Sequence, residues 1–493
     1  MKRALSFFLA LVLLSYATAC GSTAEQENAA ETPAEGAEQT VSPDPAEEPE
    51  TEAETEITDN LPEKDYEGRT ISLLTSAEQW QAFYNSEQTG EVINDAVHQR
   101  NLTVEERFGV ALDYQVFNGY GAGMADVKTA LSGSVMSGGN DYDLLVGSSS
   151  YVVPLVADRL LADMSKAEYI DLSAPWWFSY INEELEIAGM LPLAAGSFGM
   201  TNYAWATVTF FGKNLIDEYQ LEDPYTLVQE GRWTWDAMMA MSEKVHTDLD
   251  GNQIYDQNDV VGIVSTWDYM QSFGDAMGCE YTVHEEDGSV TYLPLSEKLT
   301  DINGKLYSVI NGDNFLDGYN IAAGGDAYLA MINTFATNHA LFMVHRLAHA
   351  DTTEMRNMDG YGIIPHAKYD DAQEHHITNV VAETSGIPAV VPDAEASAII
   401  LEALQYETWK SVRPAYYDIA LKEKYAQDEV SGQMLDLIFE NATCSFAYMY
   451  SRFADGAPAG NLGQTEDYAS WFAGNSKKWQ KKMNTLIETI KEG

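Results

Sequence analysis

The sequence predicts an α/β protein with a largely parallel sheet, followed by a second α/β region. Its 493 residues are enough for two or three ordinary domains or one large two-lobed unit. Apolar residues make up 45% of the chain, so a substantial core can form. From residue 69 onward, short β-rich segments alternate with helical patterns, which is typical of α/β folds. We expect the fold to begin after residue 65.

Residues 1–20 have the pattern of a bacterial lipoprotein signal peptide. Two basic residues precede an apolar run over residues 4–14, which is too short for a stable membrane span. Small residues then lead to Cys20, although Ala17 stands where a branched residue is usual. The alternatives are a plain signal-peptidase site after Ala19, or a chance cysteine. The pattern favours a mature protein that begins at diacylated Cys20 and is anchored on the extracellular face of the cell membrane.

Residues 21–65 are predicted to form a disordered acidic linker. From Gly21 to Asn60 there are thirteen Asp and Glu residues and no Lys or Arg. Such a segment cannot bury enough apolar surface to offset the entropy of ordering it, and self-repulsion extends it. The formal net charge of −50 argues against nucleic acid and anionic lipid surfaces, because phosphate binding needs Lys and Arg. High negative charge also favours a soluble monomer.

The body of the protein begins with a short, apolar, β-rich strand, RTISLLTS. The expected elements are a strand at 69–76, a helix within 91–109, a strand at 110–117, a helix within 126–139 and a strand within 142–150. This alternation indicates a largely parallel sheet. Ligands bind beyond the carboxyl ends of such strands, which marks the loops after Ser76 and Val146.

A second α/β region is expected from about Phe211 to GYGIIPHAKYDD at 360–371. After it, residues 383–409 are predicted to form a strand and a helix, and residues 476–493 a basic helix. Cys279 and Cys444 are far apart in the sequence, so either a disulfide or two buried thiols is consistent with them.

Four segments carry a family resemblance. They are GEVINDAVHQRNLTVEERFGV (90–110), FFGKNLIDEYQLEDPYTLVQEGRWTWDAM (210–238), RNMDGYGIIPHAKYDDAQ (356–373) and RPAYYDIALKEKYAQDEVSGQMLDLI (413–438). With them the chain resembles the extracellular solute-binding proteins of ABC importers, family 1, the carbohydrate-binding type with the maltose-binding fold. More closely, it resembles acidic-tethered lipoproteins of gut Firmicutes. One departure is Gly212, where Asn is usual.

The resemblance implies a two-lobed α/β fold of the periplasmic-binding-protein type II, with crossing hinge strands. Lobe 1 would comprise residues 66–210 and 383–430, and lobe 2 residues 211–382 and 431–493. The first crossing would run through residues 203–211. The implied function is capture of an oligosaccharide in an interlobe cleft for an ABC permease. An extracellular carbohydrate-active enzyme, and an adhesion or signalling receptor without a permease, are the alternatives.

The segment DLDGNQIYDQND at 248–259 resembles a calcium loop, because oxygen-bearing side chains recur at positions 1, 3, 5, 9 and 12. The expected ligands are Asp248, Asp250, Asn252, the carbonyl of Ile254, Asp256 and Asp259. Unlike an EF-hand, the loop has its glycine at position 4 and Asp rather than Glu at position 12, and a strand-like segment follows it. We interpret it as a structural Ca²⁺ site; a solvated acidic turn is the alternative.

Catalytic motifs are not convincing in this sequence. HRLAH at 345–349 has the spacing of a zinc helix, but Arg346 stands where a zinc peptidase has its glutamate base. No local signature selects a catalytic pair among the 77 acidic residues. We therefore do not expect an enzyme.

Aromatic and polar residues at expected strand ends and crossings are the candidate sugar ligands. Sugar C–H faces stack on aromatic rings, and sugar hydroxyls need polar partners such as Arg, Asp and Asn. For each ring, core packing is the alternative. The candidates are Gln79, Trp80, Ser149, Ser150, Trp205, Trp267, Asp268, Tyr269, His345, Arg346 and Ser385.

The lipid anchor can be tested directly by changing Cys20 to Ala. We expect the variant to be released into the medium or to remain unprocessed, because the acylated cysteine is the predicted anchor. Cell fractionation and the mass of the mature protein measure this, and Cys279→Ala is the control. Membrane retention with an unshifted mature mass would contradict the lipoprotein interpretation.

Overall fold

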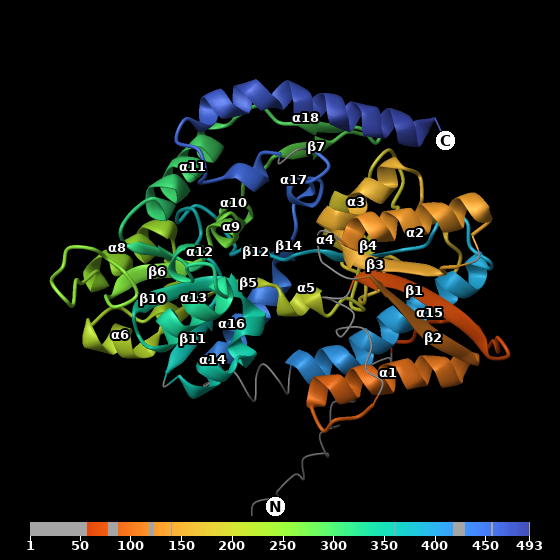
Figure 1. Cartoon of the computed structure of the whole chain (residues 1–493), viewed down its shortest axis with the longest axis horizontal. Helices are drawn as coiled ribbons and strands as arrows, with labels where there is room; N and C mark the ends of the chain where they lie inside the picture. Colours follow the sequence, from red (N-terminus) through yellow and green to blue (C-terminus); the bar gives the residue numbers. More distant parts are fainter. Residues whose placement is uncertain are drawn as a thin grey trace, which may run out of the picture. The chain divides into compact units, whose positions relative to one another are not determined.

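The computed structural model describes residues 57–76, 87–117, 123–139, 141–358, 360–417, 429–454 and 457–492. Cys20 and most of the predicted linker lie outside these residues, as do the predicted cleft residues Gln79 and Trp80. The part of the chain from Ile57 onward is one structural unit with two five-stranded sheets and two short two-stranded sheets (Figure 1).

The first sheet has the strand order β2-β1-β3-β13-β4. Its strands are β1 (Arg69–Ser76), β2 (Val110–Phe117), β3 (Leu144–Ser148), β4 (Ala194–Ala195) and β13 (Glu383–Gly386). β1 is parallel to β2 and β3, whereas β13 is antiparallel to β3 and β4. The predicted bounds of the first two strands are correct. The third strand is shorter than expected, because a helix begins directly after it.

Helices cover both faces of this first sheet (Figure 1). α1 (Val92–Phe108) and α15 (Ala394–Glu407) lie side by side on one face. α2 (Gly123–Ser137) and α3 (Ser149–Ala157) lie on the other face. The apolar side chains of β1 are buried, and strands covered on both faces read as nearly continuous apolar runs rather than alternating ones.

The second sheet has the strand order β11-β5-β10-β6-β9. Its strands are β5 (Thr207–Gly212), β6 (Val261–Ser265), β9 (Phe315–Asp317), β10 (Ala340–Arg346) and β11 (Tyr361–Ile364). β6 is parallel to β9 and β10, and β5 is antiparallel to β10 and β11. All five strands come from one continuous stretch of the chain.

Short and medium helices surround the second sheet. They are α6 (Lys213–Glu218), α7 (Pro224–Gln229), α8 (Trp235–Val245), α11 (Glu297–Ile310), α12 (Gly318–Ile321), α13 (Ala327–Ala336), α14 (Thr353–Asn357) and α16 (Glu429–Glu440). The remaining elements are α4 (Ser179–Leu185), α5 (Thr201–Ala204), α9 (Trp267–Met270), α10 (Ser272–Ala276), α17 (Phe446–Met449), α18 (Tyr468–Lys491), β7 (Thr282–His284) and β8 (Val290–Tyr292). The predicted basic helix belongs to α18, which begins eight residues earlier than expected and packs on α3, α11 and β8.

Three described passages of the chain connect the two sheets. α5 leads from the first sheet into β5, and β12 (Thr378–Asn379) leads back towards β13. β14 (Ala442–Thr443) follows α16 and leads to α17, which contacts α3 and α4. β12 and β14 pair in parallel, so two of the passages lie side by side.

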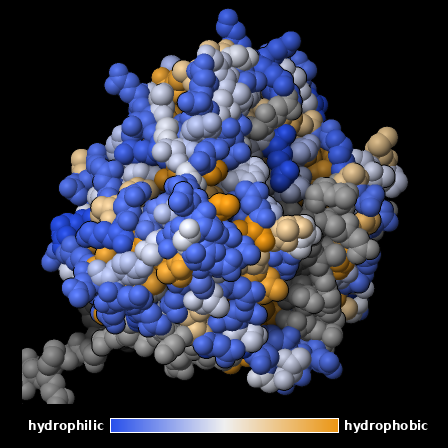
Figure 2. Space-filling model, turned by 60° about the vertical axis from the view of Figure 1, so that its left-hand side comes forward, coloured by the Kyte–Doolittle hydropathy of each residue, from blue (hydrophilic) through white to orange (hydrophobic). Residues whose placement is uncertain are grey.

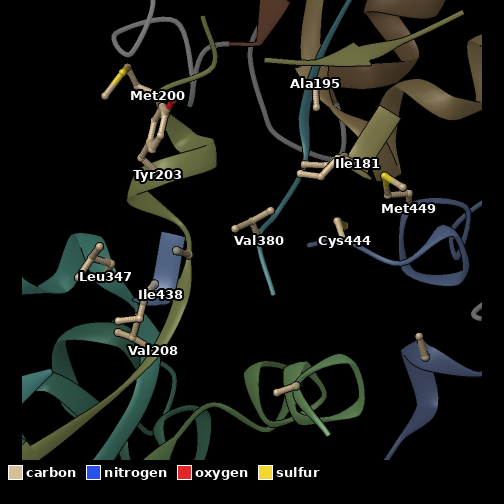
Figure 3. Packing of buried hydrophobic residues seen from close by; sticks show 14 of the residues in the cluster. Ile181, Ala195, Met200, Tyr203, Val208, Leu347, Val380, Ile438, Cys444 and Met449 are labelled. Atoms are coloured by element: carbon tan, nitrogen blue, oxygen red, sulfur yellow. The ribbon is translucent and has the colours of Figure 1, made fainter. Parts of the chain in front are cut away.

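Buried apolar side chains surround these passages. In Figure 3, Val380 lies in the middle, with Tyr203 and Ile438 on one side and Ile181 and Cys444 on the other. All five belong to one cluster of buried hydrophobic residues that includes both sheets. The core therefore continues through the connection between the sheets.

The two cysteines of the body are free thiols rather than a disulfide. Cys444 is buried and Cys279 is half-buried. Burial raises the pKa of Cys279 to about 12 and raises that of Cys444 well above its ordinary value. Both thiols are therefore protonated at neutral pH, which makes them poor nucleophiles.

The face of the molecule in Figure 2 is mostly hydrophilic. Hydrophobic residues on this face lie in small groups between hydrophilic ones. None of the described helices combines the length and the apolar character that a membrane span requires.

A buried carboxylate on α15 fixes the loop before α4. Glu402 accepts hydrogen bonds from the indole N–H groups of Trp176 at 2.7 Å and Trp177 at 2.9 Å. The ring of Trp176 also packs edge-on against Tyr406, with the ring centroids 5.1 Å apart. Burial raises the pKa of Glu402 to about 7. These two tryptophans thus serve packing within the first lobe.

The raised pKa of Glu402 predicts a pH-dependent contribution to stability. Between pH about 4.5 and 7, the native carboxyl binds its proton more tightly than the unfolded chain does, so its contribution to the free energy of unfolding falls as pH rises. Glu402→Gln removes this contribution. We expect the stability difference, wild type minus variant, to be larger at pH 5 than at pH 8. Urea unfolding measures it, with the exposed Glu168→Gln as control; a pH-independent difference would contradict it.

Candidate ligand-binding cavity

Several strand ends of the second sheet meet at one edge. The parallel strands β6 and β10 both end there, and the antiparallel strand β5 begins there. Thr207, the first residue of β5, pairs with Arg346, the last residue of β10. α9 begins with Trp267, directly after β6. In open α/β sheets, ligands bind beyond the carboxyl ends of the strands, so a site is expected at this edge.

A cavity of about 1010 Å³ lies at this edge. Second-sheet strands and their helices contribute Thr207, Trp267, Asp268, Tyr269, Gln271, Ser272, Tyr328 and Arg346. The segments after β3 and α5 contribute Ser150, Tyr151 and Trp205, and the other passages contribute Asn379, Val381, Tyr448, Ser451, Arg452 and Gly460. The cavity is thus lined by residues from both sheet regions and from the passages that connect them.

Arg346 lies among three aromatic rings. Its guanidinium carbon is 4.1 Å from the ring centroid of Trp205, 5.0 Å from that of Tyr328 and 5.2 Å from that of Tyr269. The guanidinium also donates hydrogen bonds to the hydroxyls of Tyr269 and Tyr328, the latter at 3.4 Å. Cation–π contacts and hydrogen bonds together hold rings and cation in one arrangement at the end of β10.

Two buried histidines, His345 and His349, support this arrangement. The imidazole of His345 stacks on Tyr269, with ring centroids 3.7 Å apart, and its Nδ1 lies 2.8 Å from Nε2 of His349. Burial lowers the pKa of His349 to about 3 and lowers that of His345 well below its ordinary value. The HRLAH histidines are therefore neutral packing groups that position Tyr269.

Asp268 provides a carboxylate beside Trp267. Its Oδ2 accepts a hydrogen bond from the hydroxyl of Tyr319 at 3.4 Å. Its Oδ1 is buried and has no hydrogen-bond partner among the described residues. An unsatisfied buried acceptor is costly, and a ligand hydroxyl donating to Oδ1 would satisfy it.

A second arginine, Arg452, also lines the cavity. Arg452 stacks over the ring of Tyr151, with its guanidinium carbon 3.9 Å from the ring centroid, and donates a hydrogen bond to the Tyr151 hydroxyl. Tyr151 belongs to α3, directly after β3, whereas Arg452 follows α17. This contact joins the third passage to the first-sheet side of the cavity.

Asn379 connects the cavity wall to the passages. Its backbone carbonyl accepts a hydrogen bond from Oγ1 of Thr207 at 2.8 Å, and its side-chain amide donates to the carboxyl of Asp275. Asn379 also lies opposite Thr443 in the pairing of β12 with β14. Burial raises the pKa of Asp275 to about 6. Asn379 thus connects its own passage to the other two.

The structure brings most of the predicted cleft residues together. Ser150, Trp205, Trp267, Asp268, Tyr269 and Arg346 line the cavity. Ser149, His345 and Ser385 are buried and are not part of its lining. Gln79 and Trp80 lie outside the described residues. Ligand contact for all of these residues stays a prediction.

Other lining residues were missed by sequence reasoning. Tyr151 directly follows the serines that were selected, and Tyr328 lies on α13 in a segment without a motif. Tyr448 and Arg452 come from the third passage, where no strand end was predicted. The position of Tyr151 beyond β3 could have indicated that it lines the site. No sequence feature indicated the other three residues.

The acidic loop at 248–259 is organised around three carboxylates. One oxygen each from Asp248, Asp250 and Asp259 lie within 4.8 Å of one another. Asp259 accepts hydrogen bonds from the backbone N–H groups of Leu249 at 2.8 Å and Asp256 at 3.0 Å, and these bonds lower its pKa. Asp256 is not part of this group of carboxylates. Asn252 and Asp256 accept bonds from backbone N–H groups two residues further on, and Ile254 is 65% exposed.

Comparison with known proteins identifies the fold. No family model and no curated protein matches the sequence. Among solved structures, the ABC substrate-binding protein Lmo0181 from Listeria monocytogenes, in complex with cycloalternan, is similar with a TM-score of 0.51 and 12% identity. The match covers 86% of this chain and 99% of that chain.

Two further structures are similar to the same extent. A family 1 extracellular solute-binding protein from Bifidobacterium longum subsp. infantis has a TM-score of 0.51 at 14% identity, over 85% of this chain and 100% of that chain. A cyclic α-maltosyl-1,6-maltose binding protein from Arthrobacter globiformis has a TM-score of 0.52 at 11% identity, over 86% and 100%. The predicted α/β fold of two-lobed solute-binding proteins is thereby confirmed.

Proposed function

We propose that this protein is an extracellular solute-binding receptor that captures a carbohydrate, specifically an oligosaccharide, and delivers it to an ABC permease. The observation that carries the proposal is the lining of the cavity. Aromatic rings, a guanidinium and a carboxylate with an unsatisfied oxygen converge there in about 1010 Å³. Ligand pockets typically occupy about 300–1,000 Å³, so the space suits several sugar rings.

The chemistry of the lining fits a sugar. Trp267 and Tyr448 offer ring surfaces for C–H faces, while Asp268, Asn379 and Gln271 offer groups that hydrogen-bond hydroxyls. The solved structures of similar fold include proteins described as binding cycloalternan and cyclic α-maltosyl-1,6-maltose. Their descriptions support carbohydrate as the ligand class.

The rival proposal is an extracellular carbohydrate-active enzyme. Most glycoside hydrolases use two carboxyl groups on either side of the scissile bond. Among the described residues that line the cavity, Asp268 is the single carboxylate. This favours binding over hydrolysis, and incubation with glycans followed by product analysis separates the two. A receptor for adhesion or signalling is distinguished by the absence of permease genes beside this one.

The sequence supports the cellular setting of this proposal. Two basic residues, an apolar run and Cys20 favour a lipid-anchored protein of the acidic-tethered lipoprotein type on the extracellular face of the membrane. The formal net charge of −50 favours a monomer that binds no nucleic acid and is held to the membrane by its lipid alone.

We also propose that the acidic loop holds a structural Ca²⁺ ion. Asp248, Asp250 and Asp259 supply convergent carboxylate oxygens, the ligands that this hard cation prefers. The loop ends just before β6, whose carboxyl end leads to Trp267. The ion would fix the start of a strand that positions the cavity wall.

Removal of the Trp267 ring should weaken ligand binding without unfolding the protein. Trp267 is half-buried and lines the cavity, so Trp267→Ala should cost about 1–3 kcal/mol of binding free energy from lost apolar burial. A glycan array read by thermal shift first finds the ligand, and calorimetry then measures affinity. Tyr180→Ala, an exposed ring outside this cavity, is the control. Equal affinity of wild type and Trp267→Ala would show that the ligand binds elsewhere.

Calcium dependence of thermal stability tests the metal proposal. Chelation should lower Tm and added Ca²⁺ should restore it, since a ligand at 100 times its Kd adds about 2.7 kcal/mol to the native state. Asp248→Ala should abolish the response, while Asp287→Ala, in the turn between β7 and β8, should retain it. A melting curve that is unchanged by chelator would mean that the loop is an acidic turn.

A further inference from the structure

The charge of the cavity is opposite to that of the chain. Among the described residues of its lining, two side chains are cationic, Arg346 and Arg452, and one is a carboxylate, Asp268. The chain has 77 Asp and Glu residues and only 27 Lys and Arg residues, for a formal net charge of −50. A lining with more cations than anions is therefore a local exception in a strongly anionic protein.

The contacts of Arg346 fix where its guanidinium lies. They include the rings of Trp205, Tyr269 and Tyr328 and the hydroxyls of the two tyrosines. Burial, Tyr328 and Asp268 raise the pKa of Tyr269 above its ordinary value, so this hydroxyl keeps its proton. The guanidinium thus occupies a fixed place in the cavity lining.

Arg452, which follows α17, is the second cationic residue of the lining. Its contacts are the ring and the hydroxyl of Tyr151. No Asp or Glu among the described residues lies within ion-pair distance of it. A planar guanidinium held against a ring is pre-organised to bind a carboxylate or sulfate with two parallel hydrogen bonds.

Asp268 adds a requirement of its own. Its buried Oδ1 needs a donor, and an anionic group cannot supply one. A sugar hydroxyl can. The ligand must therefore combine hydroxyl donors for Asp268 with an anionic group for the arginines.

We propose that the captured carbohydrate is anionic: an oligosaccharide that carries a carboxylate, as in a uronic acid, or a sulfate. Its anionic group binds Arg452 and its hydroxyls bind Asp268. This inference rests on the proposed function and names the substrate class of the same cavity. Without local cations, an acidic protein would repel such a ligand, which gives the two arginines a function beyond holding rings.

Matched pairs of neutral and anionic sugars test the inference. The probes are trigalacturonic acid and its methyl ester, glucuronic-acid-substituted xylotriose and xylotriose, and sulfated and unsulfated N-acetyllactosamine. Calorimetry at 0.15 M salt, where the Debye length is about 8 Å, limits repulsion from distant acids. We expect the anionic member of at least one pair to bind roughly 10- to 100-fold more tightly, which is the effect of a charge-assisted hydrogen bond. The pair that responds distinguishes carboxylate from sulfate.

Variants of Arg452 assign the preference to this cavity. Arg452→Gln should reduce the preference for the anionic sugar by roughly tenfold or more, and Arg452→Lys should keep part of it, because the charge remains. Arg232→Gln removes the same charge from the surface away from the cavity and should change nothing. A full preference in Arg452→Gln would overturn the assignment to Arg452.

The remaining outcomes separate this inference from the proposed function. Tighter or equal binding of the neutral member in every pair would overturn the anionic ligand and leave the carbohydrate receptor intact. Failure of every probe to bind, in calorimetry and in thermal shift, would overturn both.

Discussion

The cavity depends on the hydrogen bonds of Asn379. This residue binds Thr207 at the start of β5 through its carbonyl and Asp275 of α10 through its side chain, and it lies opposite Thr443 where β12 pairs with β14. Every segment that connects the two sheets within the described residues is therefore held at one point. The cavity lining comes from both sheet regions, so the relative positions of its side chains depend on this junction. Core side chains around Val380 pack the other side of the same passage and exclude water from it (Figure 3).

Arg346 holds aromatic rings of the cavity together, as Asn379 holds the connecting passages together. It is the last residue of β10, and the rings that it holds come from three separate segments: Trp205 after α5, Tyr269 on α9 and Tyr328 on α13. A single cation thus fixes the relative positions of side chains that the backbone alone would leave independent. His345, the neighbouring residue on the strand, is buried and supports Tyr269 through stacking.

Only part of the site could be predicted from the sequence. Strand bounds at 69–76 and 110–117, and the strand ends before Ser150 and Trp267, follow from apolar runs and the residues that bound them. These patterns do not show which side chains face the cavity. Ser150 and Arg346 line the cavity, whereas their neighbours Ser149 on α3 and His345 on β10 do not, because tertiary packing decides which side chain reaches the opening. Tyr328 and Arg452 reach the cavity through tertiary packing of segments that have no motif, and no local pattern could indicate that.

The position of β13 has a consequence for the order in which the fold can form. β13 begins at residue 383, yet it lies between β3 and β4, which are complete by residue 195. All strands of the second sheet lie between residues 207 and 364. As the chain is synthesised or exported from its N-terminus, all strands of the second sheet are therefore available before β13. The first sheet cannot be completed until β13, almost two hundred residues after β4, is available. Until then the edges of β3 and β4 that pair with β13 remain open. Unpaired strand edges can bind chaperones or aggregate before the sheet is complete.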